Sequence, residues 1–126
     1  MRYCFGVDVG GTSIKAGLLQ EDGIIVDKWE IDTRKENHGE AILPDIAKLV
    51  GEKYVEAGLN KEDIVGIGIG VPAPVDEEGI VHNTANLGWG YKEVKKELEE
   101  LTGFPVEVGN DANMAALGEM WLGAGR

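Results

Sequence analysis

Two short stretches of this sequence combine residue types suited to phosphate and sugar chemistry. The first is Asp8-Val9-Gly10-Gly11-Thr12-Ser13-Ile14-Lys15, an acid followed by two glycines, two hydroxyls and a cation. Glycines leave backbone N–H groups open to an anion, hydroxyl and ammonium groups donate to phosphate oxygens, and a carboxylate can hold hydrated Mg²⁺. The candidate nucleotide ligands are therefore Asp8, Gly10, Gly11, Thr12 and Lys15, with Asp8 also the candidate metal ligand. The alternative interpretation of the stretch is a plain β-hairpin turn.

The second stretch is Gly109-Asn110-Asp111-Ala112-Asn113, between a short apolar segment and a helical pattern. The amide of Asn110 can donate to and accept from sugar hydroxyls, and the carboxylate of Asp111 can accept a hydroxyl proton as a general base. Asn and Asp are also favoured N-cap residues. One of the two can cap the following helix while its neighbour does chemistry.

A third candidate region is the loop between Pro72 and Gly90. Its prolines reduce the entropy lost on ordering, and its Asn residues and Trp89 could contact a small polar ligand. Considered alone, the loop is more simply a surface connection. His82 has no evident partner in the sequence and is interpreted as a solvated side chain.

The elements that must position these residues follow from the hydrophobic pattern. The β-prone segments 2–9, 13–19 and 24–31 are separated by turn-forming residues, which predicts three consecutive antiparallel strands. Apolar residues at helical spacing over 37–57, with Pro44 in the first turn or at a kink, precede an uncharged strand at 64–71. We expect a helix over 91–101, a strand at 105–108 and a helix over 111–122 to follow.

The element order βββαβαβα predicts an α/β fold with a mixed five-stranded sheet and helices on both faces. The fourth strand, 64–71, carries no charge and is expected to be central and covered on both faces. No linker or repeat divides the chain, and 126 residues suit one domain.

Composition excludes several classes of function. A formal net charge of −11 argues against nucleic-acid partners and against an anionic membrane surface. No apolar run reaches the roughly 20 residues of a membrane span. With one cysteine and two histidines, the chain can form neither an internal disulfide nor a Cys/His zinc cluster. These features indicate a reducing, cytoplasmic location.

Four motifs, taken in order, resemble the ROK (repressor, open reading frame, kinase) family of sugar kinases over nearly the whole chain. They are Asp8-Val9-Gly10-Gly11-Thr12, Gly70-Val71-Pro72-Ala73-Pro74-Val75-Asp76, Asn86-Leu87-Gly88-Trp89 and Asn110-Asp111-Ala112-Asn113. Within the family, bacterial glucokinases look most similar. The resemblance implies an actin-like ATPase fold, in which two ribonuclease-H-like lobes close around ATP and sugar. Residues 1–126 would form the N-terminal lobe; a structural zinc site and any homo-oligomer contact would belong to a C-terminal lobe outside this chain.

The same resemblance implies roles for individual residues. Gly10, Gly11 and Thr12 would contact the ATP phosphates and Asp8 would lie near Mg²⁺. The sugar pocket would include Ala73, Pro74, Asn86 and Asn110, with Asp111 as catalytic base. The implied reaction transfers the γ-phosphoryl of ATP to the 6-hydroxyl of glucose, giving glucose 6-phosphate. The family often has glycine where this chain has Ala73, which bears on sugar preference. Without the second lobe, the isolated chain is expected to be inactive.

Several other functions are consistent with parts of the pattern. A sugar-responsive ROK regulator would need a DNA-binding segment ahead of the first strand, and a stand-alone lobe could bind sugar or nucleotide without catalysis. A ribonuclease-H-like nuclease needs several converging acids, and segment 64–71 supplies none. A chaperone-type or filament-forming ATPase could share the Gly-Gly-Thr turn without requiring Asn110-Asp111.

Overall fold

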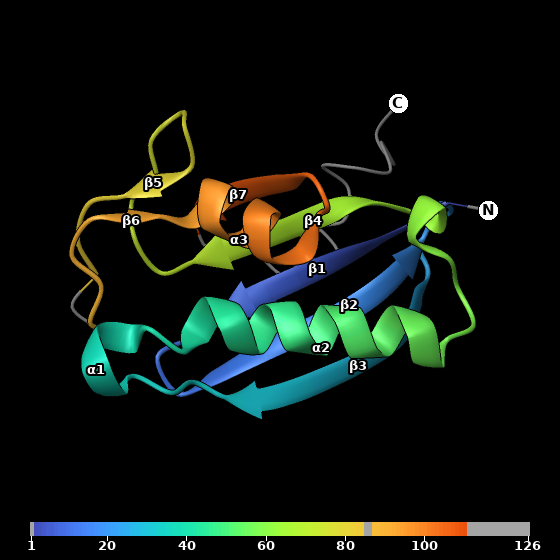
Figure 1. The fold of residues 1–126 in the computed structure, drawn as a ribbon, viewed down its shortest axis with the longest axis horizontal. Helices are drawn as coiled ribbons and strands as arrows, with labels where there is room; N and C mark the ends of the chain where they lie inside the picture. Colours follow the sequence, from blue (N-terminus) through green and yellow to red (C-terminus); the bar gives the residue numbers. More distant parts are fainter. Residues whose placement is uncertain (1, 85–86, 111–126) are drawn as a thin grey trace.

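The computed structural model describes residues 2–84 and 87–110, which include a five-stranded sheet in the order β3-β2-β1-β4-β7 (Figure 1). Three of its strands form an antiparallel meander, β1 (Tyr3–Val9), β2 (Ser13–Gln20) and β3 (Ile25–Asp32). In the turn between β2 and β3, the Gly23 N–H donates to the Gln20 carbonyl at 2.8 Å. This glycine has a φ of +88°, which a residue without Cβ adopts at little cost. The predicted antiparallel order is confirmed.

The two remaining strands of the sheet run parallel to β1. Strand β4 (Ile64–Val71) pairs with β1 on one side and with β7 (Val106–Asn110) on the other. The carboxyl ends of β1, β4 and β7 therefore meet at one edge of the sheet, which we call the carboxyl edge. In Figure 1 this edge lies at the left, and it is where loops from separate parts of the chain gather.

Two helices cover one face of the sheet and pack against each other, α2 (Ile42–Glu56) and α3 (Val94–Thr102) (Figure 1). Their apolar side chains close a core over alternate strand residues, among them Phe5, Val7, Ile67, Ile69 and Val106. The mixed five-stranded sheet is confirmed. The helix predicted over 111–122 lies outside the described residues, and both long helices within them occupy the same face. Among the described residues, no helix is long and apolar enough to cross a membrane.

The opposite face of the sheet is rich in glycine. Side chains alternate between faces along a strand, so residues one position away from the core residues point to the other side. Register aligns Gly6 with Gly17 and Gly68, and Gly70 with Gly109. Gly6, Gly17 and Gly68 are buried. We call this surface the glycine face, and it also carries Cys4, Asp8 and Lys15.

The region between β3 and β4 differs from the sequence expectation. Instead of one helix over 37–57, a short helical segment, α1 (Glu36–Gly39), precedes α2, and a 3₁₀ turn (Lys61–Asp63) precedes β4. Asn37 and His38 within α1 have φ values of +54° and +61°, so the chain cannot continue there as a right-handed helix. Pro44 lies in the first turn of α2, as predicted, where no intrahelical N–H bond is lost.

Two short strands were not predicted, β5 (Ile80–Val81) in the third candidate region and β6 (Lys92–Glu93) just after it, and they pair antiparallel. A pair of two-residue strands carries too few positions to show a period of two. The helix and strand expected after this loop are observed as α3 and β7, within a few residues of the predicted bounds.

Candidate functional site

The turn between β1 and β2 contains the predicted phosphate ligands Gly10, Gly11 and Thr12. Its geometry requires glycine at position 10, because a Cβ there would lie 2.9 Å from the Ser13 carbonyl oxygen. The Gly10 N–H donates to that same oxygen at 2.9 Å, so it does not face outward toward an anion as the sequence suggested. Among the described residues, no backbone hydrogen bond joins the N–H of Gly11 or Thr12 to a carbonyl outside the strand pairs. Both N–H groups stay candidate donors to phosphate.

A threonine from a distant part of the chain fixes this turn. The Thr33 hydroxyl donates to the Gly10 carbonyl at 2.8 Å, and the Thr33 N–H donates to the Thr12 carbonyl at 3.0 Å. Thr33 is buried, with 8% of its surface exposed. Both bonds restrain the backbone of the turn. The sequence did not indicate this role, because no motif next to position 33 marks Thr33 as a partner of the turn.

Asp8 lies near the end of β1, half-buried, on the glycine face. Its Cα partners are Lys15 on β2 and Gly70 on β4, and Gly70 in turn is aligned with Gly109 on β7. Lys15 is exposed and shares the face of Asp8. The two glycines place no side chain beside Asp8 on the β4 side. The predicted carboxylate and cation are therefore neighbours, next to strand positions without side chains.

This arrangement suits the coordination that magnesium prefers. Mg²⁺ takes oxygen ligands, keeps several waters and is commonly held by one or two carboxylates together with substrate phosphates. The described residues contain no group of three or more His, Cys, Asp and Glu side chains that could form a complete protein cage. Asp8 at the carboxyl edge fits the single-carboxylate mode.

The predicted sugar-side residues lie at the same edge where the structure describes them. Ala73 is buried and Pro74 exposed, directly after β4. Asn110 is the last residue of β7 and is aligned with Val71, the last residue of β4. Asn86 and Asp111 lie outside the described residues. The structure thus brings the backbones of Asp8, the Gly10–Thr12 turn, the Ala73–Pro74 turn and Asn110 to one edge of the sheet.

Trp89 has a different role from the ligand contact suggested by its sequence. It is buried, with 3% of its surface exposed, and its indole N–H donates to the Gly39 carbonyl at 3.1 Å. Its backbone closes a short loop with Thr84, whose N–H donates to the Trp89 carbonyl at 2.9 Å. Trp89 therefore anchors the loop that contains residues 85–86.

His82 also departs from the sequence expectation, since it has a partner. Its Nε2 lies 2.9 Å from Asp76 Oδ2, across a tight turn closed by Gly79. Asp76 Oδ1 accepts hydrogen bonds from the backbone N–H groups of Glu78 and Ile80. The bond from His82 and the bond from Ile80 lower the pKa of Asp76 below its ordinary value. Gly79, with a φ of +75°, closes the turn that brings the two side chains together, and a glycine that follows polar residues is the sequence signal for such a turn.

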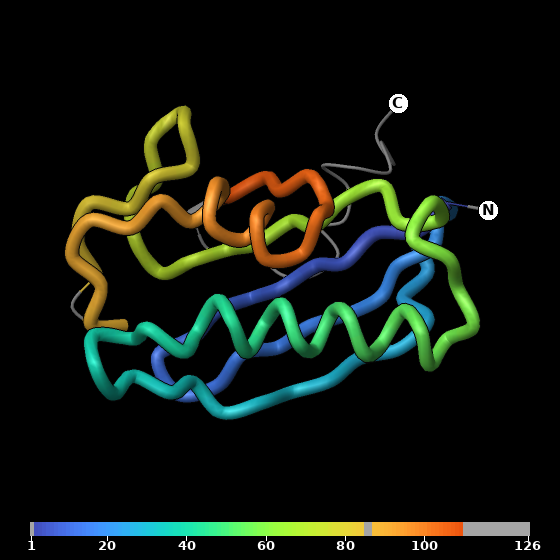
Figure 2. Tube along the Cα trace, in the orientation of Figure 1, coloured from blue at the N-terminus to red at the C-terminus, as the bar shows by residue number. Residues whose placement is uncertain are grey.

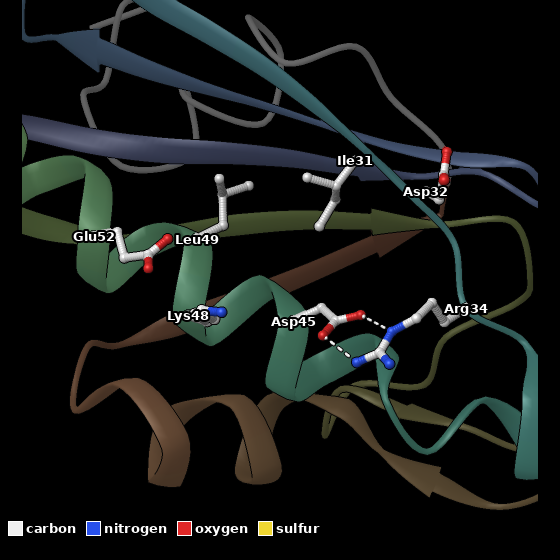
Figure 3. A pocket seen from close by; sticks show the side chains of 7 residues that line it. All are labelled: Ile31, Asp32, Arg34, Asp45, Lys48, Leu49 and Glu52. Carbon is white, nitrogen blue, oxygen red and sulfur yellow. Dashed lines mark hydrogen bonds and ion pairs between the residues drawn. The ribbon is translucent and has the colours of Figure 1, made fainter.

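A hollow between β3 and α2, with a volume of about 340 Å³, is lined by residues outside the predicted site (Figure 3). Arg34 and Asp45 face each other across its rim in a two-point ion pair, with N–O distances of 2.8 and 2.7 Å. These bonds raise the pKa of the Arg34 guanidinium further. None of the predicted site residues lines this hollow, so it is separate from the predicted site.

Comparison with known proteins matches this chain to one family over nearly its whole length. The model of the ROK family matches residues 4–126. The chain belongs to the ROK family. A glucokinase from Halalkalibacterium halodurans is 46% identical over 125 residues, covering 98% of this chain and 38% of that protein.

Solved structures of ROK proteins share the fold. A ROK glucokinase from Streptomyces griseus, in complex with glucose and AMPPNP, is 34% identical, with a TM-score of 0.77, and the match covers 98% of this chain and 38% of that one. A ROK transcriptional regulator, described as a homologue of the Escherichia coli MLC protein, is 22% identical with a TM-score of 0.74, covering 86% and 28%. At that identity the regulator shows the fold alone. The chain has the actin-like ATPase fold of ROK kinases, and it spans less than two fifths of the length of these relatives.

Proposed function

We propose that this chain is the N-terminal lobe of a cytoplasmic hexose kinase, which transfers the γ-phosphoryl of ATP to glucose and yields glucose 6-phosphate. The observation that carries the proposal is the gathering of the phosphate turn, Asp8, the Ala73–Pro74 turn and Asn110 at one edge of the sheet. The similarity to a glucokinase and to a glucokinase bound to glucose and AMPPNP supports the sugar and the nucleotide.

Each group at this edge has a task in the proposed reaction. Bound Mg²⁺ would neutralise charge on the phosphates, and Asp8 would hold it. The Gly11 and Thr12 N–H groups would orient the phosphates, with Lys15 as an additional cation on the glycine face. Asn110, Asn86 and the Ala73–Pro74 turn would hold the sugar. Asp111, directly after Asn110, would accept the proton of the attacking hydroxyl.

A ROK-type regulator lobe, or a lobe that binds sugar and nucleotide without transfer, is the alternative. The regulator has the same fold, so fold alone does not separate the two. The net charge of −11 disfavours duplex DNA as a partner of this chain. Salt-dependent binding of duplex DNA in a mobility-shift assay would favour the regulator.

The direct test measures ADP release with Mg-ATP, with and without glucose, for the protein expressed from its own gene. We expect glucose-dependent turnover, and a loss of about 10²–10⁴-fold in kcat on Asp111→Asn, because a general base contributes about that factor. Glu100→Gln, an exposed carboxylate on α3, is the matched control and should retain kcat. Glucose-independent ADP release, or full activity in Asp111→Asn, would contradict the proposal. Residues 1–126 alone are expected to show no turnover.

A further inference from the structure

The connection between β3 and α2, residues 33–39, is tied to three separate parts of the molecule. At its start, Thr33 donates to the carbonyls of Gly10 and Thr12 in the phosphate turn. Next to it, Arg34 forms the two-point ion pair with Asp45 on α2 (Figure 3). At its end, the Gly39 carbonyl accepts the indole N–H of Trp89. One short segment thus contacts the phosphate turn, a core helix and the loop 84–89.

The contact between residues 37–39 and the loop 84–89 is made backbone against backbone. A Cβ on Gly39 would overlap the Leu87 carbonyl, and a Cβ on Gly88 would lie 3.3 Å from His38 backbone atoms. Figure 2 shows the two segments side by side at the left end of the molecule. Such close approach leaves little freedom for the loop, whose Leu87 and Trp89 side chains are both buried. The described residues of this loop, Thr84 and Leu87 to Trp89, are therefore held against residues 37–39.

The backbone of this segment is strained where it makes the contact. Asn37, His38 and Gly39 have φ values of +54°, +61° and +68°, three successive left-handed residues of which two carry side chains. Each left-handed residue with a side chain costs about 1–2 kcal/mol. Strain of this kind persists where surrounding contacts over-determine the conformation, and it clusters at functional sites. Both exposed residues, Asn37 and His38, lie at the carboxyl edge.

We propose that the connection 33–39 is a strut that fixes the spacing between the phosphate turn and residues 87–89, which follow the proposed sugar ligand Asn86 in the sequence. This inference rests on the proposed function, since it assigns the two ends of the strut to the nucleotide side and the sugar side of one reaction. Thr33 and Trp89 are its positioning residues, because their side chains donate to backbone carbonyls and not to substrate. Thr33 holds the Gly10 carbonyl at one end of the strut, and Trp89 holds the Gly39 carbonyl at the other.

Phosphoryl transfer is sensitive to such spacing. The reaction needs the attacking hydroxyl in line with the γ-phosphorus at close range, and a displacement of about 1 Å can cost about 100-fold in rate. Either substrate alone can still bind when the distance between their sites is loosened. Weakening the strut should therefore lower kcat while leaving the separate affinities for glucose and nucleotide nearly unchanged.

The experiment removes one hydrogen bond at each end of the strut and, as a control, one hydrogen bond away from the carboxyl edge. Thr33→Val removes the bond to the Gly10 carbonyl, and Trp89→Phe removes the N–H that binds Gly39 while keeping an aromatic ring in the core. Thr102→Val is the matched control: its hydroxyl donates to the Leu98 carbonyl at 2.8 Å within α3, away from the carboxyl edge. Thr33→Ser keeps the hydroxyl. All are made in the protein expressed from its own gene.

We expect kcat to fall at least about tenfold in Thr33→Val and Trp89→Phe, with the Kd of glucose and of AMPPNP, each measured alone, within about threefold of wild type. Thr33→Ser should keep most of the wild-type kcat. Thr102→Val should lower the stability of the protein without lowering kcat. Unchanged kcat in Thr33→Val, or an equal loss in Thr102→Val, overturns the strut while the proposed function stands. A wild-type protein without glucose-dependent ADP release overturns both.

Discussion

The two faces of the sheet differ in what their residues contribute. On the helix-covered face, the strands present large apolar side chains such as Phe5, Ile67 and Ile69, all fully buried beneath α2 and α3. On the glycine face, the neighbouring positions of the same strands are Gly6, Gly66, Gly68 and Gly70. Glycine within a strand weakens it, because it packs no side chain and loses more entropy on folding. One face thus supplies the large apolar side chains of the core, and the other has no side chain on β4 beside Asp8.

The largest effect should come from the helix-covered face. Phe5→Ala removes a fully buried ring that lies 6.3 Å from the ring of Trp29. We expect the free energy of unfolding to fall by about 3–5 kcal/mol, the usual cost of emptying such a site. Chemical denaturation measures it. Leu101→Ala, which is 50% exposed on α3, should stay within about 0.5 kcal/mol. A small loss for Phe5→Ala would remove the contrast between the faces.

The glycine face should show its largest effect in activity. Asp8→Asn keeps the size of the side chain and removes the charge that would hold Mg²⁺. We expect kcat/KM to fall about 100-fold or more, since a metal ion supplies several kcal/mol of charge stabilisation to such a reaction. Asp27→Asn, an exposed carboxylate on β3, should leave kcat/KM unchanged in the same assay. Retained activity in Asp8→Asn would show that Asp8 does not hold Mg²⁺.

Smaller effects on stability are expected when two glycines, one on the glycine face and one in α2, are replaced by alanine. Gly68→Ala adds a methyl group at a buried strand position aligned with Gly6, and overpacking of this kind costs about 1–3 kcal/mol. Gly51→Ala lies within α2, where a Cβ would meet no atom within 4 Å, and should stabilise the protein by about 0.5–1 kcal/mol. Opposite signs in thermal melts would sharpen the comparison, and two stabilising changes would contradict it.

The smallest effect belongs to neither face. The pKa of Asp76 is lowered in the folded protein by the bonds from His82 and from the Ile80 N–H. A carboxyl group with a lowered pKa stabilises the fold above its ordinary pKa, and that contribution is lost as pH falls toward the folded value. Below about pH 4, the melting temperature should therefore drop more in wild type than in Asp76→Asn. If the melting temperatures of the two proteins fell in parallel with pH, the bonds to Asp76 would contribute nothing measurable to stability.

Much of the fold could be predicted because its signals are local. Gly10-Gly11 and Glu21-Asp22-Gly23 mark the turns of the meander, and the uncharged run 64–71 marks the buried strand, all as observed. The left-handed residues Asn37 and His38 could not be predicted, because their conformation depends on Gly88 and Trp89, some fifty residues away. The pairing of Asp76 with His82 depends likewise on a turn between them.

The candidate site was predictable in its residue types and less so in its contacts. The motifs assigned nucleotide or sugar contacts to Asp8, the Gly10–Thr12 turn, Ala73, Pro74 and Asn110, and the structure brings these backbones together at one edge of the sheet. It also shows that the Gly10 N–H is already bonded and that Trp89 points into the core. Thr33 was missed because a lone threonine after a strand carries no signal until its long-range partners are known. The roles of Asn86 and Asp111 stay predictions.

The chain order of the sheet bears on how the protein folds. The meander joins β1, β2 and β3 through short turns, so its ladders close locally and can form while the rest of the chain is still being made. Strand β4 must instead pair Ile64 with Tyr3 and Gly70 with Asp8, across the intervening helix. Non-local pairing of this kind slows folding, because the loop must close before its contacts form. We therefore expect the carboxyl edge, which needs β4 and β7 beside β1, to form after the meander.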